Sequence, residues 1–179
     1  KKYPDEMSIN KDGSTSGASF SSEQWKKDMK QVISDLIDHI TTQSYAKYIV
    51  GFRVTAGRTL EWLPWSDNIL DSSPATDKAF RKWLSEKYKT DAALQRAWNN
   101  STVTLKTAKQ PANSQMTAAV YENLLDTATQ MQSIDYHKFL ADATADAFTG
   151  FCSYVKQKTG RKWIVGGYFG YIWNAYSYE

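Results

Sequence analysis

"YIVGFRVTAGRTLEWLPW" (Tyr48–Trp65) is the stretch from which the fold can be read. Its first seven residues are apolar apart from one arginine, and most are β-branched or aromatic, which is typical of a strand buried on both faces. We therefore predict a strand over Tyr45–Val54 and a loop over residues 55–72. A single carboxylate, Glu61, follows between a leucine and a tryptophan. The sequence thus places one acid among aromatic residues just past the C-terminal end of a strand.

The segments on either side of this strand predict an α/β fold. Residues 1–20 are polar and rich in glycine and serine, which indicates a loop. Apolar residues at steps of three and four then predict a helix over 21–42, capped by a serine. A serine followed by Pro74 marks the start of a second helix. A third short helix, "DAALQRAW", follows a threonine cap.

The second half of the chain predicts a long helical excursion that ends in another strand. Residues 117–159 carry a helical apolar pattern with a break near 132–134, and Gly160 suits the end of a helix. "KWIVGGYFGYIW" (Lys162–Trp173) is the second apolar strand. The order helix, strand, helices, strand is typical of α/β proteins with parallel strands. We expect the two strands to be parallel neighbours with the 21–42 helix packed against them.

Composition excludes several classes of function. The chain has 179 residues, and its net charge of +3 comes from 22 basic and 19 acidic residues that are scattered, which argues against a nucleic-acid partner. No apolar run approaches the length of a membrane span. The one cysteine, Cys152, belongs to no zinc or haem pattern, and nucleotide-binding glycine motifs are absent. We therefore expect no cofactor, no metal and no membrane partner.

Aromatic residues gather after the two predicted strands. Tryptophan, tyrosine and phenylalanine make up 14% of the chain, and many fall in loops where core packing does not require them. The C-terminal ends of parallel strands build the active site of such folds. Sugar rings stack on aromatic side chains, so this pattern favours a carbohydrate substrate. The predicted substrate-binding residues are Arg58, Trp62, Trp65, Tyr168, Tyr171 and Trp173.

A carboxylic acid among tryptophans suits proton transfer. Apolar surroundings disfavour the anion, so such an acid keeps a proton that it can donate to a glycosidic oxygen. The alternative is that Glu61 pairs with Arg58 on the rim while the tryptophans pack against a helix. Asp135 and His137 lie about 200° apart on a helix and cannot form a catalytic pair.

Four stretches of the chain together resemble a known family. "GFRVTAGRTLEW", "FRKWLSEKYKTDAALQRAW", "DYHKFLADATADAFTGFCSYVKQKTG" and "WIVGGYFGY" resemble the middle of a (β/α)8-barrel glycoside hydrolase, similar to the β-galactosidase-like enzymes of glycoside hydrolase family 42. The resemblance covers residues 20–173. It implies a retaining glycosidase that acts on an oligo- or polysaccharide, with Glu61 as the acid/base at the end of the fourth barrel strand.

Two departures from the family pattern leave alternatives open. Such enzymes carry an asparagine before the acid/base glutamate, where this chain has Leu60, which indicates either a diverged subgroup or a lost activity. A full barrel also needs about 250 residues. We therefore expect residues 1–179 to be a central fragment of a partial TIM barrel that lacks the nucleophile.

Two further readings of the chain stay open. A non-catalytic carbohydrate-binding relative and a purely structural α/β domain are the alternatives to a glycosidase fragment. Strand edges left without neighbours favour self-association into a homo-oligomer.

Overall fold

The computed structural model describes residues 2–10, 12–57, 60–62, 71–112, 115 and 125–168. Its elements run in the order η1 (Pro4–Glu6), β1 (Met7–Ile9), β2 (Thr15–Ala18), α1 (Glu23–Thr41), η2 (Ala46–Tyr48), β3 (Gly51–Arg53), α2 (Pro74–Tyr88), α3 (Asp91–Trp98), α5 (Met131–Lys158) and β4 (Ile164–Gly166). The fold is α/β, helix-rich, with one short parallel pair, as the sequence predicts. None of the described helices has the length and apolarity needed to cross a membrane.

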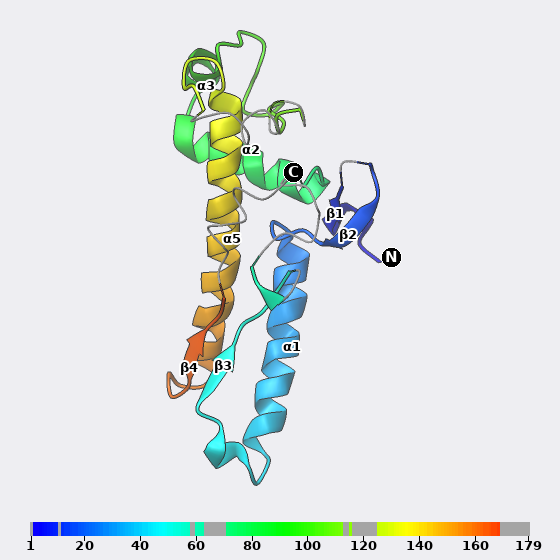
Figure 1. Cartoon of the computed structure of the whole chain (residues 1–179), viewed down its shortest axis with the longest axis vertical. Coiled ribbons are helices and arrows are strands. Elements are labelled where there is room, and N and C mark those ends of the chain that lie inside the picture. The colour runs from blue at the N-terminus through cyan, green and yellow to red at the C-terminus, as the bar shows by residue number, and fades with distance from the viewer. Residues whose placement is uncertain are drawn as a thin grey trace.

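β3 and β4 form the parallel pair that the sequence predicts. The register joins Gly51 to Ile164, Phe52 to Val165 and Arg53 to Gly166. Both strands point toward the end of the molecule that carries the β1–β2 hairpin and α2 (Figure 1). Gly51 is required in this register, because a Cβ there would lie 2.7 Å from the carbonyl oxygen of Ile164.

The helix α5 joins two separate hydrophobic cores. It has 28 residues, so at 1.5 Å per residue it is about 42 Å long, and α1 lies beside its C-terminal half (Figure 1). The first core, with α2 and α3, buries Phe80, Leu84, Leu94, Val103, Ala108, Tyr136 and Phe139. The second core, with α1 and the sheet, buries Phe20, Ile37, Val54, Trp62, Ala147, Phe151 and Val155.

Asp135 anchors α5 to α2 and α3 in the first core. Its side chain is fully buried and forms an ion pair with Lys87. It also accepts hydrogen bonds from the Tyr88 hydroxyl at 2.7 Å and from the Trp98 indole nitrogen at 2.8 Å. Burial and the bond to Asp135 raise the pKa of Tyr88, so its hydroxyl stays a donor. Asp135 therefore has a structural role, since all its described partners belong to the helices.

Asp71 ties the N-terminal hairpin to the start of α2. Its carboxylate accepts hydrogen bonds from the backbone of Ile9 and Ser73 and, at 2.6 Å, from the Thr76 hydroxyl. Its carbonyl oxygen accepts a bond from the Tyr136 hydroxyl at 2.9 Å. These bonds hold the hairpin, α2 and α5 in one arrangement at the end of the sheet.

Several predicted boundaries are wrong, and the predicted break near 132–134 is absent, because α5 runs without interruption from Met131 to Lys158. Residues 1–20 are not all loop, because β1 and β2 form an antiparallel hairpin whose strands are too short and polar to show an apolar alternation. The first strand begins at Gly51 rather than Tyr45, since Ala46–Tyr48 form a 3-10 turn. The long helix begins at Met131, and the residues just before it form a turn in which Asp126 bonds Thr129. Residues 116–124 lie outside the described part.

The helix starts follow the caps that the sequence predicts. Ser22 accepts from the backbone of Trp25, Ser73 from Thr76 and Thr90 from Ala93. Pro74 occupies the first turn of α2. Gly160 follows α5 with φ of +57°, where glycine costs the least.

Replacing Asp135 with alanine tests the anchor in the first core. The change leaves a half-buried ammonium group, a hydroxyl and an indole N–H without their acceptor. Breaking such a buried pair costs about 3 kcal/mol or more of unfolding free energy. Asp142→Ala is the matched control, because Asp142 lies exposed on the same helix and, among the described residues, accepts a hydrogen bond only from the Trp83 indole N–H. If urea denaturation shows that both variants lose the same unfolding free energy, Asp135 does not anchor the first core.

Candidate active site at the strand ends

The loop after β3 leaves the sheet and returns to it at Trp62. The ladder first continues past the strands, with the backbone N–H of Val54 donating to Gly166 O at 2.9 Å. Further along the chain, the backbone N–H of Trp62 donates to the carbonyl oxygen of Tyr168, just beyond the end of β4, at 3.2 Å. This return places Glu61 directly at the C-terminal end of the parallel pair.

The base of this loop, where Val54, Trp62 and Gly167 meet, is closely packed. The Trp62 indole N–H donates to Val54 O at 3.2 Å, which joins the residue that leaves the sheet to the residue that returns. Gly167 lies against the same point, and a Cβ there would be 2.5 Å from Val54 O and 2.8 Å from a ring carbon of Phe148. Contacts below 3.0 Å are not tolerated by real side chains, so only glycine fits here without movement.

The prediction that Trp62 stacks on a sugar is wrong. Only 3% of its surface is exposed, and its ring packs against Phe20, Trp25, Phe148 and Phe151 with centroids 5.5–6.4 Å apart. The indole turns toward the helices because its N–H is satisfied by Val54 O and its ring fills the second core. Trp62 thus fixes the position of its neighbour and does not itself face a ligand.

Glu61 carries a buried oxygen without a partner among the described residues. The residue is half-buried, and its Oε2 atom is shielded from solvent without a hydrogen bond to any described residue. Buried polar atoms are nearly always paired, so an exception indicates a function or a ligand. The preceding Leu60 has φ of +66° and is 57% exposed. The backbone at this position is therefore strained in order to turn Glu61 back to the sheet.

The two faces of the sheet differ in character. Phe52, Val54 and Val165 pack into the second core against the helices. Because side chains alternate along a strand, Arg53 points to the opposite face. There its guanidinium lies 4.9 Å from the ring centroid of Tyr168, which is 59% exposed. Tyr168 therefore lies beside the strand ends, and the Arg53 guanidinium lies next to its ring.

Sequence reasoning missed Arg53 and several acceptors of the hairpin. The signal for Arg53 was its position as the one charged residue in "YIVGFRV". Glu6, Asn10 and Ser16 each carry a buried side-chain oxygen without a partner in the described residues. Phe20 follows β2 and packs in the second core, where its ring lies 5.5 Å from that of Trp62. No apolar pattern marked these short polar strands.

The other predicted site residues cannot be placed. Arg58, Trp65, Tyr171 and Trp173 lie outside the residues that the structure describes, so their roles stay predictions. Within the described part, no three His, Cys, Asp or Glu side chains are grouped as a metal site would require.

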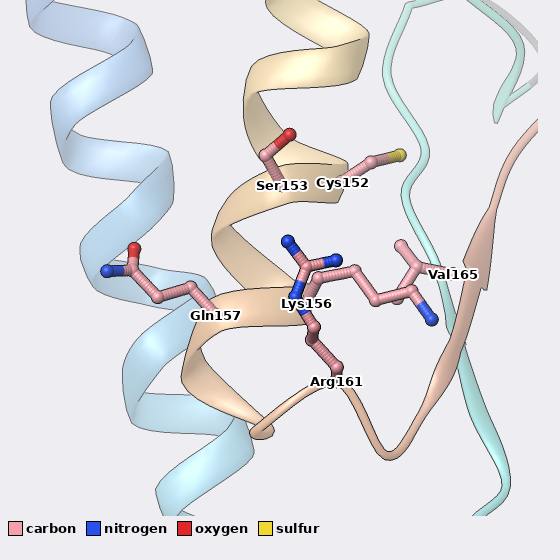
Figure 2. A pocket seen from close by; sticks show the side chains of 6 residues that line it. All are labelled: Cys152, Ser153, Lys156, Gln157, Arg161 and Val165. Carbon is pink, nitrogen blue, oxygen red and sulfur yellow. The ribbon is translucent and has the colours of Figure 1, made fainter.

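A separate pocket lies between α5 and β4. Its volume is about 480 Å³, and its lining is Cys152, Ser153, Lys156, Gln157, Arg161 and Val165 (Figure 2). The ammonium group of Lys156 is engaged, because it donates to Trp163 O at 2.7 Å. Burial raises the pKa of the Cys152 thiol, which makes it a poor nucleophile. This pocket does not include Glu61, and the strand ends remain the stronger candidate site.

A family assignment follows from comparison of the whole chain with known proteins. The family model of the glycoside hydrolase family 42 β-galactosidases matches residues 1–179. The chain belongs to this family. No curated protein sequence matches it significantly.

Solved β-galactosidases share the fold of this family member. The enzyme from the psychrophilic Marinomonas ef1 superposes with a TM-score of 0.67 at 14% identity, over 98% of this chain and 26% of its own. The enzyme from Bacillus circulans sp. alkalophilus gives a TM-score of 0.64 at 21% identity. The enzyme from the Antarctic haloarchaeon Halorubrum lacusprofundi gives a TM-score of 0.66 at 14% identity. Each of these two matches covers 94% of this chain and 24% of the other enzyme. The chain thus spans about a quarter of each, and the structure is part of a TIM barrel.

Adjacent glycines provide a test of the loop base in this family member. We expect Gly167→Ala to lower the unfolding free energy by about 1–3 kcal/mol, because the added methyl group overpacks against Val54 O and Phe148. Gly166→Ala is the control, since a Cβ there meets nothing within 4 Å. Denaturation midpoints of the two variants measure the difference. A Gly167→Ala variant as stable as Gly166→Ala would show that Gly167 does not pack tightly against Val54 O and Phe148.

Proposed function

We propose that this chain supplies the acid/base glutamate of a retaining β-galactosidase-type glycoside hydrolase, and that this residue is Glu61. The observation that carries the proposal is the buried Oε2 atom of Glu61, which lies near the C-terminal end of a parallel strand pair and has no hydrogen-bond partner among the described residues. In barrel enzymes this edge of the sheet is where the reacting groups lie. Because buried polar atoms are nearly always paired, an oxygen held there without such a partner points to a functional role.

The reaction needs one carboxyl group that first gives and then takes a proton. In the first step, protonated Glu61 donates its proton to the glycosidic oxygen while a second carboxylate attacks the sugar carbon from the other side. The C–O bond breaks and a covalent glycosyl-enzyme forms. In the second step, Glu61 removes a proton from water, which displaces the second carboxylate from the sugar. Each role requires an unoccupied oxygen on Glu61.

The substrate proposed for the site is a β-galactoside of an oligo- or polysaccharide. Sugar hydroxyl groups are hydrogen-bond donors, and the Oε2 atom of Glu61 is an acceptor without a partner among the described residues. The exposed ring of Tyr168 offers a surface for the C–H face of a sugar. Because the chain spans about a quarter of its structural neighbours, the nucleophile is proposed to lie in another part of the barrel.

A non-catalytic carbohydrate-binding protein is the second candidate. The observation that favours it is Leu60, which stands where the family resemblance implies an asparagine and is more than half exposed. Leucine offers no hydrogen bond to a sugar hydroxyl. The activity of variants at Glu61 decides between the two candidates.

Self-association of the 179-residue chain is a further part of the proposal. Within the described residues the β3–β4 sheet has no third strand, and Val50 and Ile164 are 72% and 73% exposed beside it. Open strand edges with apolar neighbours pair readily with other chains. We expect sedimentation to show concentration-dependent dimers or larger species, and Ile164→Lys to shift the distribution to monomer. A monomer at all concentrations would contradict this part.

Replacing Glu61 with glutamine tests the acid/base role in the full-length enzyme. The amide keeps the size of the side chain but cannot donate the proton, so kcat/KM for alkyl β-galactosides should fall roughly 10²–10⁴-fold. An aryl galactoside with a good leaving group should lose far less in the first step. Its turnover should then stall at deglycosylation, and azide should restore turnover in Glu61→Ala by taking the place of water.

Glu86→Gln is the matched control for these kinetics. Glu86 lies exposed on α2, where it faces Lys82 at 3.8 Å, and it has no contact with the strand ends. Its substitution should leave both substrates unaffected. If Glu61→Gln lowers the rates of alkyl and aryl substrates equally, or changes neither, Glu61 is a rim residue and the binding protein becomes the better candidate.

A further inference from the structure

We propose that Arg53 makes the site selective for sugars that carry an anionic group, a carboxylate or a sulfate ester. This inference rests on the proposed function, because it assigns a substrate class to the same strand ends. It concerns a residue on the face of the sheet that turns away from the described helices. It follows from the placement of the guanidinium, from its support by Tyr168 and from donors that bond none of the described residues.

Arg53 belongs to the same structural unit as Glu61. It is the last residue of β3 and lies exposed on the face away from the helices. Its neighbour on that face, Tyr168, accepts through its carbonyl oxygen the backbone N–H of Trp62. Glu61 immediately precedes Trp62. One backbone hydrogen bond thus links the Arg53–Tyr168 pair to the proposed acid/base residue.

The ring of Tyr168 holds the guanidinium in place. The separation of 4.9 Å from the ring centroid lies within the range of a cation–π contact. A guanidinium that stacks on a ring can still donate hydrogen bonds along its edge. Arg53 forms no hydrogen bond or ion pair with any described residue. A cation supported in this way, whose donors bond none of the described residues, is prepared to bind an anion at a low cost in side-chain entropy.

The geometry of the guanidinium selects the class of ligand. Its parallel N–H groups match two oxygens of a carboxylate or a sulfate, and such charge-assisted pairs are about twice as strong as neutral hydrogen bonds. A neutral galactose ring would engage the group only through hydroxyl oxygens. A uronic acid or a sulfated galactose satisfies the charge as well as the donors, so it is the better occupant.

The test compares neutral and anionic substrates in the full-length enzyme. The probes are an aryl β-galactoside, the matching β-galacturonide and the matching galactoside 6-sulfate. We expect wild type to prefer at least one anionic probe, and Arg53→Gln to lower the ratio of anionic to neutral kcat/KM by about 10–100-fold. Tyr168→Leu should lower the same ratio by removing the ring, whereas Tyr168→Phe should keep it. Arg96→Gln, an exposed arginine on α3, is the control that leaves the ratio unchanged.

A binding measurement separates this inference from the proposed catalytic role. Titration of galacturonate and galactose 6-sulfate against galactose, followed by tryptophan fluorescence, does not need turnover. Tighter binding of an anionic sugar that is lost in Arg53→Gln supports the inference even where Glu61→Gln shows no effect on rate. Equal binding of charged and neutral sugars overturns it. A lowered melting temperature of Arg53→Gln without a change in the ratio also overturns it, because Arg53 then pairs with an acid of the barrel.

Discussion

The indole of Trp62 is the contact on which the arrangement at the strand ends depends. Its N–H bonds Val54 O, its backbone N–H bonds Tyr168 O, and its ring fills the space between α1, α5 and the sheet. The same residue therefore closes a loop, extends a parallel ladder and completes a core. Since Glu61 is the residue before it, the position of the acid is set by packing on the other face of the sheet. A buried tryptophan gives that position more rigidity than a loop alone would have.

Two buried carboxylates determine how the helices above the sheet are placed. The Asp135 carboxylate accepts hydrogen bonds from an ammonium group, a hydroxyl and an indole N–H of α2 and α3. The Asp71 carboxylate accepts hydrogen bonds from the hairpin and from the first turn of α2. Hydrogen bonds to buried charges are directional, so they fix the orientation of elements that apolar contacts would hold less specifically. Because α5 passes through both cores, this arrangement is transmitted along one continuous helix to the sheet.

The face of the sheet without helices is where chemistry is expected. In a TIM barrel one face of each strand packs on helices and the other turns inward, and here Arg53 and Tyr168 occupy the inward face. The partial barrel exposes them together with Ile164. Membership of glycoside hydrolase family 42 accounts for the fold. Arg53 places a positive charge on this face of the sheet.

The sequence by itself determined the elements whose signals are local. The serine and threonine caps, Pro74 and the apolar period of α1 and α2 depend on neighbouring residues, so the pattern located them. The parallel pairing of two apolar strands followed from the order of elements, and the family resemblance located the barrel edge. The position of Glu61 beyond a strand could also be read directly.

Only the tertiary structure decided what each aromatic side chain does. A tryptophan beside an acid can face a sugar or fill a core, and the sequence does not distinguish the two. The choice for Trp62 depends on Phe20 and Phe148, which are distant in sequence, and on the carbonyl oxygen of Val54, which comes within reach of the indole N–H only when the chain has folded back. The β1–β2 hairpin likewise depends on Asp71, which accepts a hydrogen bond from the backbone of Ile9. Its short strands bury too little apolar surface to be recognised from the sequence.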